Sequence, residues 1–113
     1  MLSLNRWQGI GNLGQTPELR YTGSGSPVTN LVVATNRKYR SQEGETQQET
    51  TWHRITVFGK LAEACCEHLQ KGDQVYVEGR LQTRQWEGKD GTKRHTTEIV
   101  ASRIDFGNRT PRD

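Results

Sequence analysis

Aromatic and cationic side chains alternate with apolar ones along residues 51–60, which read TWHRITVFGK. Successive side chains of a β-strand point to opposite faces, so this stretch would place Trp52, Arg54 and Phe58 together on one face. The intervening residues form an ordinary core-facing side. Two exposed rings beside a guanidinium suit single-stranded nucleic acid, because bases stack on rings and phosphates pair with cations. Burial of the rings against a partner subunit or a second sheet is the alternative interpretation.

A second stretch carries the same combination of side chains. Residues 74–86 read QVYVEGRLQTRQW, and a strand there would align Arg80, Arg84 and Trp86 on one face, opposite Val75 and Val77. Such an unusual face is rarer by chance on two strands than on one. The repetition therefore favours a functional surface.

A third cluster consists of Arg37, Lys38, Tyr39 and Arg40. We expect it at the base of a long, mobile hairpin loop that spans 38–49, where the chain turns polar around a glycine. A run of cations is usually the solvated start of a loop. The tyrosine inside this run favours a basic–aromatic binding site instead.

The composition describes one small, polar domain. The chain has 113 residues, of which 30% are hydrophobic, and its mean hydropathy is −0.93. Such a chain buries only a modest core, so oligomerisation would be a natural source of extra stability. The net charge of +3 and the pI of about 9.1 favour a polyanionic partner.

Cysteine usage and the start of the chain predict a cytoplasmic protein. Cys65 and Cys66 are adjacent and cannot easily bridge, which fits a reducing compartment. Residues 1–5 lack the basic start and apolar run of a signal peptide. No apolar run approaches the roughly 20 residues of a membrane span, so we expect no membrane contact.

Turn signals and periodicity divide the chain into five strands and one helix. Leu61, Cys65 and Leu69 recur at helical spacing, with Gly72 as the expected cap, whereas Pro17 excludes a central strand from 14–21. The expected strands are 2–13, 28–37, 50–58, 74–86 and 93–105, and the expected helix is 60–71.

This order of elements predicts an all-β fold, a five-stranded OB-fold barrel with one helix between strands three and four. The OB-fold presents a curved sheet face and hairpin loops to oligonucleotides, and the basic–aromatic stretches fall there. We expect the domain to cover residues 1–106, followed by a flexible C-terminal end at 107–113.

The chain resembles bacterial single-stranded DNA-binding proteins over nearly its whole length. The blocks that carry the resemblance include GNLGQ at 11–15, PELRY at 17–21, WHR at 52–54, FGKLAE at 58–63, LQKGDQVYVEG at 69–79 and LQTRQW at 81–86. The resemblance implies an OB-fold that assembles as a homotetramer and binds single-stranded DNA with little sequence preference. It also implies a nucleoid-associated role in protecting that DNA during replication, recombination and repair.

The resemblance also assigns individual residues. The base-stacking aromatics of the family fall on Tyr39, Trp52, Phe58 and Trp86. Position 39 is usually tryptophan in the family, and the smaller tyrosine ring can still stack. The subunit-interface residues fall on His53 and Tyr76.

Cations that accompany the aromatics are the candidates for phosphate contacts. The candidates are Arg54, Arg80, Arg84, Arg37, Lys38, Arg6, Arg20 and Lys60. Lys71 better suits the end of the predicted helix, where the helix dipole favours a cation.

Neither catalysis nor a cofactor is expected. Cys65, Cys66 and His68 are close in sequence but would point from different sides of the helix, so we expect no metal site. Lys60 follows a glycine but lacks the glycine-rich loop of a P-loop, and no Ser/His/Asp arrangement can be read from the spacing.

The expected partners are single-stranded DNA, further copies of the chain, and replication or repair proteins. Family members usually recruit such proteins through a flexible tail with an acidic tip. This chain ends at Asp113 without that pattern, so recruitment by such a tail is not expected. The alternative is a tailless primosomal or protein-interaction module, similar to the primosomal replication protein N group, which would be a dimer with weaker DNA affinity.

Overall fold

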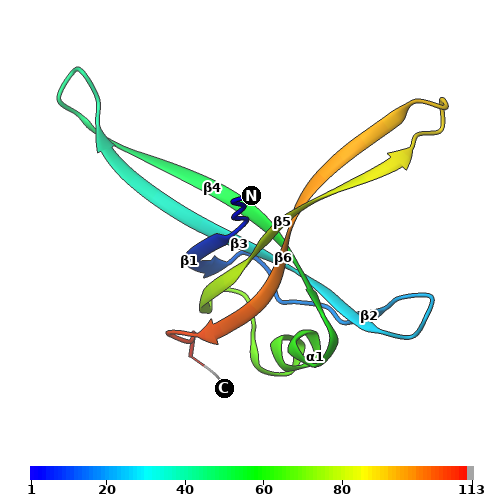
Figure 1. Cartoon of the computed structure of the whole chain (residues 1–113). Helices are drawn as coiled ribbons and strands as arrows, with labels where there is room; N and C mark the ends of the chain where they lie inside the picture. The colour runs from blue at the N-terminus through cyan, green and yellow to red at the C-terminus, as the bar shows by residue number, and fades with distance from the viewer. Residues whose placement is uncertain (112–113) are drawn as a thin grey trace.

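Strands dominate the computed structural model, which describes residues 1–111 (Figure 1). The elements in chain order are β1 (Trp7–Leu13), β2 (Arg20–Tyr21), β3 (Pro27–Arg40), β4 (Thr46–Phe58), α1 (Gly59–His68), β5 (Gln74–Glu87) and β6 (Lys93–Phe106). Within these residues, no helix is both long and apolar enough to cross a membrane.

The sheet runs in the order β1-β5-β6-β4-β3-β2 and closes through an additional β1–β3 pairing. Five strands therefore form a barrel, and the two-residue β2 extends it beside β3. All pairings are antiparallel except β4–β6. With α1 between β4 and β5, the third and fourth barrel strands, this is the predicted OB-fold arrangement.

Apolar side chains at every second position of the strands fill the barrel. Leu31, Val33, Ile55, Val75 and Val77 are each no more than 1% exposed. The helix adds Ala62 and Cys65 to this core from one end of the barrel (Figure 1). The core therefore occupies the inside of the barrel and its α1 end, and leaves the outer side of the strands for other contacts.

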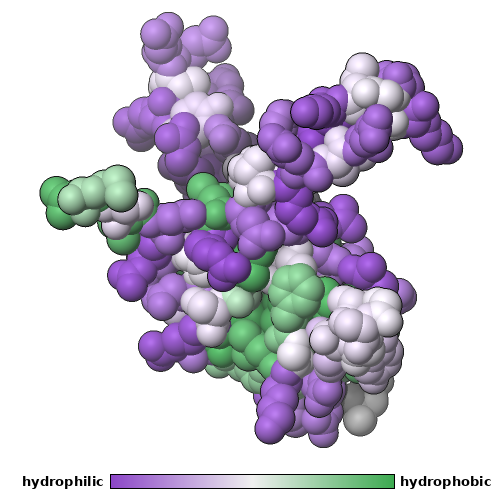
Figure 2. Space-filling model, turned by 45° about the vertical axis from the view of Figure 1, so that its right-hand side comes forward, coloured by the Kyte–Doolittle hydropathy of each residue, from purple (hydrophilic) through white to green (hydrophobic). Residues whose placement is uncertain are grey.

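Two long hairpins extend beyond the core as arms (Figure 1). We call residues 36–50 the β3–β4 arm and residues 83–97 the β5–β6 arm; nearly all of their side chains are exposed. Figure 2 shows that hydrophilic side chains cover both arms, while hydrophobic surface gathers on the body below.

The prediction of a long loop at 38–49 is wrong. The β3–β4 ladder continues without a register shift to the pair Arg40↔Thr46, and the turn is confined to 41–45, where Gly44 has a φ of 83°. A two-stranded ribbon satisfies its backbone hydrogen bonds without burying either face. The apolar alternation that normally reveals a strand is therefore missing from this arm.

Other boundaries also differ from expectation. Strand β1 begins at Trp7 rather than at residue 2. Before it, Asn5 Nδ2 donates to Leu81 O at 2.7 Å, and Leu81 N donates to Asn5 Oδ1 at 2.9 Å. Helix α1 ends at His68, where Leu69 takes an extended backbone and its N–H donates to Cys65 O. Residues 20–21 of the segment expected to be irregular form β2, because the edge of β3 is open beside them.

The glycine expected to cap the helix has another role. Gly72 lies beyond the helix end in a turn, with a φ of 95°, and its N–H donates to Leu13 O at 2.8 Å. A positive φ is accessible to glycine without steric cost, so this turn connects α1 to β5 and ties it to β1.

Hydrogen bonds also continue past Phe106, into the segment expected to be a flexible end. Gly107 N donates to Gln74 O, and Gln74 N donates to Asn108 O, both at 2.8 Å. Thr110 donates to Asp73 Oδ1 from its backbone N at 2.8 Å and its hydroxyl at 3.0 Å. Residues 107–110 are thus anchored to the start of β5, while residues 112 and 113 of that end lie outside the described residues.

Candidate nucleic-acid interface

One continuous outer face of the sheet carries most of the predicted binding residues. Side chains that pair across a ladder lie on the same face. Five strands are linked in this way by the pairs Arg20↔Val28, Asn30↔Thr56, Thr56↔Val100 and Arg84↔Thr96. We define this outer face by Arg20, Asn30, Trp52, Arg54, Thr56, Phe58, Arg84, Trp86, Thr96 and Glu98. It joins the body of the barrel to the β5–β6 arm.

The four predicted stacking rings are all open to solvent. Trp52 is 60% exposed, Phe58 48%, Trp86 50% and Tyr39 41%. Burial of these rings within the protomer is therefore excluded. Tyr39 differs from the others because the ladder pairs it with Gln47, which puts it on the side of the ribbon opposite to Trp52.

Trp52 rests against the backbone at the end of β1. A Cβ added at Gly14 would lie 2.5 Å from Trp52 Cζ3, which is far inside van der Waals contact. Glycine therefore leaves room for the six-membered edge of the indole at this point. With 60% of the side chain exposed, the ring remains accessible to a ligand.

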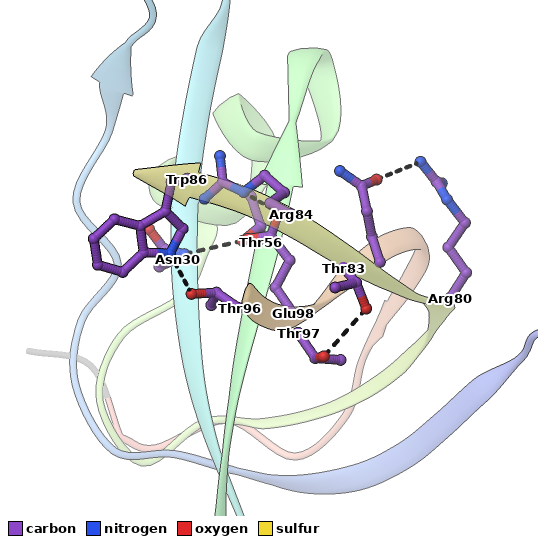
Figure 3. A network of polar contacts seen from close by, with 10 residues as sticks. Asn30, Thr56, Arg80, Thr83, Arg84, Trp86, Thr96, Thr97 and Glu98 are labelled. Carbon is purple, nitrogen blue, oxygen red and sulfur yellow. Dashed lines mark hydrogen bonds and ion pairs between the residues drawn. The ribbon is translucent and has the colours of Figure 1, made fainter. Parts of the chain in front are cut away.

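A chain of polar contacts crosses the outer face (Figure 3). Arg84 Nε lies 3.0 Å from Glu98 Oε1, and the Thr56 hydroxyl donates to Glu98 Oε2 at 3.0 Å. Asn30 Nδ2 donates to Thr56 Oγ1 at 3.2 Å, and Arg20 Nη2 donates to Asn30 Oδ1. These bonds tie β2, β3, β4, β6 and β5 together. Within residues 1–111 they leave other guanidinium N–H groups of both arginines available to a ligand.

Phe58 forms part of a hollow of about 220 Å³ that this polar chain lines. An adjoining hollow is lined in part by Arg20, Asn30 and Arg54. Two predicted phosphate-binding arginines, Arg20 of β2 and Arg84 of β5, thus line the same hollow as Phe58, and a third, Arg54 of β4, lines the adjoining hollow with Arg20. Sequence reasoning missed Asn30 and Glu98. Strand pairing would have placed them on the same face as Thr56 and Arg84.

Trp86 is held in place on the β5–β6 arm. Its Nε1 donates to Thr96 Oγ1 at 2.9 Å, and the Arg94 guanidinium lies 5.8 Å from the ring centroid (Figure 3 shows the Thr96 bond). Hollows on the arm are lined by Trp86 together with Lys89 and Arg94, and by Trp86 with Lys93. Sequence reasoning missed these three cations, because it assigned no binding role to the turn at 87–91 or to the strand expected at 93–105.

Acidic side chains accompany the arginines of both arms. Asp90 Oδ2 lies 3.6 Å from Arg94 Nη2, and the Thr92 hydroxyl donates to Asp90 Oδ1 at 2.6 Å. The hydrogen bonds from Thr92 hold the pKa of the Asp90 carboxyl below its usual value. On the other arm, Arg37 Nη2 lies 3.9 Å from a Glu49 oxygen.

The remaining predicted cations are exposed but are not gathered around a ring of the outer face. Arg80 donates to Gln82 on its own strand at 3.2 Å, and Lys38 lies on the β3–β4 arm. Lys60 lies in the first turn of α1, two residues after Phe58, and Arg6 precedes β1. Their phosphate contacts stay predictions.

The two predicted interface residues make contacts inside the protomer. His53 Nε2 and Thr35 Oγ1 are 2.9 Å apart, and the His53 ring centroid lies 5.1 Å from that of Trp7. The Tyr76 hydroxyl donates to Glu78 Oε1 at 2.9 Å and accepts from Gln8 at 2.8 Å. Both side chains are half-buried, so their role between subunits stays a prediction.

The other candidates for chemistry in the described part of the chain are metal ligands and the Cys65 thiol. Residues 1–111 contain no group of three or more His, Cys, Asp or Glu side chains that could hold a metal ion. Burial, reinforced by the neighbouring Cys66, raises the pKa of the Cys65 thiol to about 12, which is unfavourable for a nucleophile. Far from the outer face, Asp105 raises the pKa of Arg103, which it bonds at 3.1 Å.

Comparison with known proteins places this geometry in a family. The sequence model of the Single-strand binding protein family matches residues 4–107. The chain is similar to the Plasmodium falciparum SSB, solved in complex with ssDNA, at 32% sequence identity and a TM-score of 0.83, covering 96% of this chain and 98% of that one.

It is also similar to a deletion mutant of the single-stranded DNA binding protein from Thermus aquaticus, at 32% identity and a TM-score of 0.81. That comparison covers 93% of this chain and 51% of the other, so the chain spans about half the length of the Thermus protein. With the family model matching nearly its whole length, the chain belongs to the single-strand binding protein family.

Proposed function

We propose that the chain binds single-stranded DNA with little sequence preference and protects it during replication, recombination and repair. Family membership supports this function, as does the single-stranded DNA in the complex of the Plasmodium relative. The observation that carries the proposal is the exposure of Trp52, Phe58 and Trp86 on one outer face. Arg20 and Arg84 line the hollow that contains Phe58, and Arg54 lines the adjoining one.

The binding mechanism follows from these side chains. Each base that stacks on a ring contributes about 1–3 kcal/mol, with little sequence preference because every base has a π-face. The arginines neutralise phosphates and release counterions, which makes the affinity fall with salt. Duplex DNA should bind far more weakly, because its bases are hidden within the stack.

Assembly as a homotetramer is part of the proposal. In the described structure, β1 pairs with β3 only at Asn12 and Leu13, which leaves its edge from Trp7 to Ile10 without a strand, and Ile10 is 60% exposed. An open strand edge with an exposed apolar side chain favours pairing with another chain. We propose that His53 and Tyr76 lie near such subunit contacts, and that replication or repair proteins meet the chain in the nucleoid.

Fluorescein-labelled oligo-dT, titrated against variants and followed by anisotropy, tests the stacking surface. Trp52→Ala and Trp86→Ala should each weaken binding by about 5- to 150-fold. Tyr21→Ala is the control, because Tyr21 is an exposed ring that lies on the side of β2 opposite to Arg20. Full affinity in both tryptophan variants would exclude this surface.

Light scattering of the same samples measures the mass of the assembly. A tetramer that binds oligo-dT tightly supports the proposal. A dimer with weak DNA affinity would indicate the primosomal or protein-interaction module instead.

A further inference from the structure

The β5–β6 arm contains a three-part arrangement of acid, arginine and ring. The Arg94 guanidinium lies over one face of the Trp86 ring, 5.8 Å from the centroid, and Asp90 holds that guanidinium at 3.6 Å. The Thr96 hydroxyl accepts the indole N–H at 2.9 Å and so fixes the edge of the ring. One face of the indole is thus covered and its orientation is set.

The β3–β4 arm repeats the arrangement with different residues. The Arg37 guanidinium lies over the Tyr39 ring, 4.9 Å from the centroid, and Glu49 lies across the ladder at 3.9 Å from Arg37. Among the described residues, no cation lies over Trp52 or Phe58 on the body of the barrel. Off the arms, the Arg109 guanidinium lies 5.8 Å from the ring centroid of Phe106, but that ring is half-buried. Among the described exposed aromatics, the arrangement therefore occurs on the arms.

A physical difference between arm and body explains why the arms need such support. Trp52 packs on the Gly14 backbone, so the body itself holds that ring. The arms have no core beneath them, and an unsupported indole would rotate among several rotamers and lose that freedom on binding. A guanidinium over the ring supplies the missing second surface, because a cation is attracted to the negative face of the π-system.

We propose that Arg94 and Arg37 are positioning residues, each of which covers one face of an arm aromatic and leaves the other face for a single base of the bound strand. The inference rests on the proposed function and deepens it, since it states how the two arm rings are prepared for stacking. Asp90 is suited to hold Arg94 because the Thr92 hydrogen bonds keep its carboxyl ionised.

This inference differs from a simple electrostatic role for the same arginines. A cation that only meets a phosphate acts independently of the ring. A cation that supports the ring loses its effect when the ring is absent. Lys89 is a matched control, because it is an exposed cation beside Trp86 in the same hollow and does not lie over the ring.

A double-mutant cycle separates the two roles, with labelled oligo-dT anisotropy as the measurement. Arg94→Gln should weaken binding about fivefold in the native background but less than about twofold when Trp86→Leu is also present. Arg94→Lys, which keeps a cation over the ring, should retain most of the affinity. Lys89→Gln should have the same effect with and without Trp86.

A second measurement needs no DNA. In a Trp52→Phe background, where the remaining tryptophans are Trp7 and Trp86, acrylamide quenching reports how accessible the Trp86 ring is. Arg94→Gln should raise the quenching constant, and Lys89→Gln should leave it unchanged. Circular dichroism melts of each variant confirm that the barrel is intact.

The outcomes of the two proposals are distinguishable. Equal losses for Arg94→Gln and Lys89→Gln, additive with Trp86→Leu, and unchanged quenching would overturn the positioning role and leave DNA binding in place. A native chain that fails to bind oligo-dT would instead overturn the proposed function itself.

Discussion

Gly14 is the position at which one added methyl group should disturb the proposed DNA surface and spare the barrel. Its Cβ would lie 2.5 Å from Trp52 Cζ3, and the three nearest atoms all belong to the indole. Carbon atoms need about 3.5 Å, so the ring must move by roughly 1 Å. Trp52 is 60% exposed, and it can therefore move outward into solvent without displacing backbone.

The expected magnitudes follow from that geometry. Removing a stacking ring costs about 1–3 kcal/mol of binding free energy, and a displaced ring keeps part of this. We therefore expect Gly14→Ala to weaken oligo-dT binding by about 0.5–1.5 kcal/mol, or roughly 2- to 12-fold. The free energy of unfolding should change by less than about 1 kcal/mol, because the backbone entropy that alanine removes from the unfolded chain offsets the lost packing.

Two other glycines make the assay specific. A Cβ at Gly11 would lie 2.2 Å from Ala34 O, a backbone atom in the β1–β3 closure, so Gly11→Ala should lower the unfolding free energy by about 2–3 kcal/mol or more. Gly23 has no atom within 4 Å of an added Cβ, and Gly23→Ala should affect neither property.

Anisotropy with labelled oligo-dT measures the affinity, and urea unfolding followed by circular dichroism measures the stability. The reasoning fails if Gly14→Ala unfolds as easily as Gly11→Ala, since the clash would then be with the barrel. It also fails if Gly14→Ala binds oligo-dT like the native chain while Trp52→Ala does not.

Two further predictions concern the buried Cys65 thiol and the half-buried Glu98 carboxylate. Burial raises the pKa of the Cys65 thiol from 9.0 to about 12. The unfolded chain therefore loses the thiol proton at a lower pH than the folded chain does, and the free energy of unfolding falls above pH 9. Between pH 8 and pH 10, urea unfolding should show the native chain losing about 1.4 kcal/mol more than Cys65→Ala, and equal losses would contradict the shift. Glu98→Gln removes a negative charge beside Arg84 on the outer face, and anisotropy at low salt should show oligo-dT binding about two- to threefold tighter. Asp105→Asn, the control at an ion pair off the outer face, should leave the affinity unchanged, and an equal gain there would refute the local effect.

Side-chain alternation was sufficient to predict the outer face in those parts of the strands that have the core on their other side. The buried Ile55 and Val57 fix the parity of β4, so Trp52, Arg54 and Phe58 had to point outward. The order of five strands and one helix then predicted the OB-fold barrel, which the structure confirms.

The arms could not be predicted in the same way, because neither side of them is buried. Residues 38–49 show no apolar alternation, so the ladder that continues to Arg40↔Thr46 left no signal in the sequence. The side of Tyr39 relative to Trp52 depends on that unbroken ladder and was therefore hidden as well. Arg94 and Glu98 were missed for a related reason, since their roles depend on which residue faces them across β5 and β6.

The arms also set the energetic character of the binding surface. The chain has a radius of gyration of 16.8 Å, whereas a compact domain of this length would have one of about 13 Å, and the difference reflects hairpins that extend beyond the core. Ribbons without buried apolar contacts belong to the low-stability end of a structure and bend at little cost. A flexible polyanion requires such adaptability, but stacking requires rings that are already oriented. The arms meet both requirements locally: the ribbon can bend, while the hydrogen bond from Trp86 to Thr96 and the guanidinium of Arg94 keep the ring in place on it.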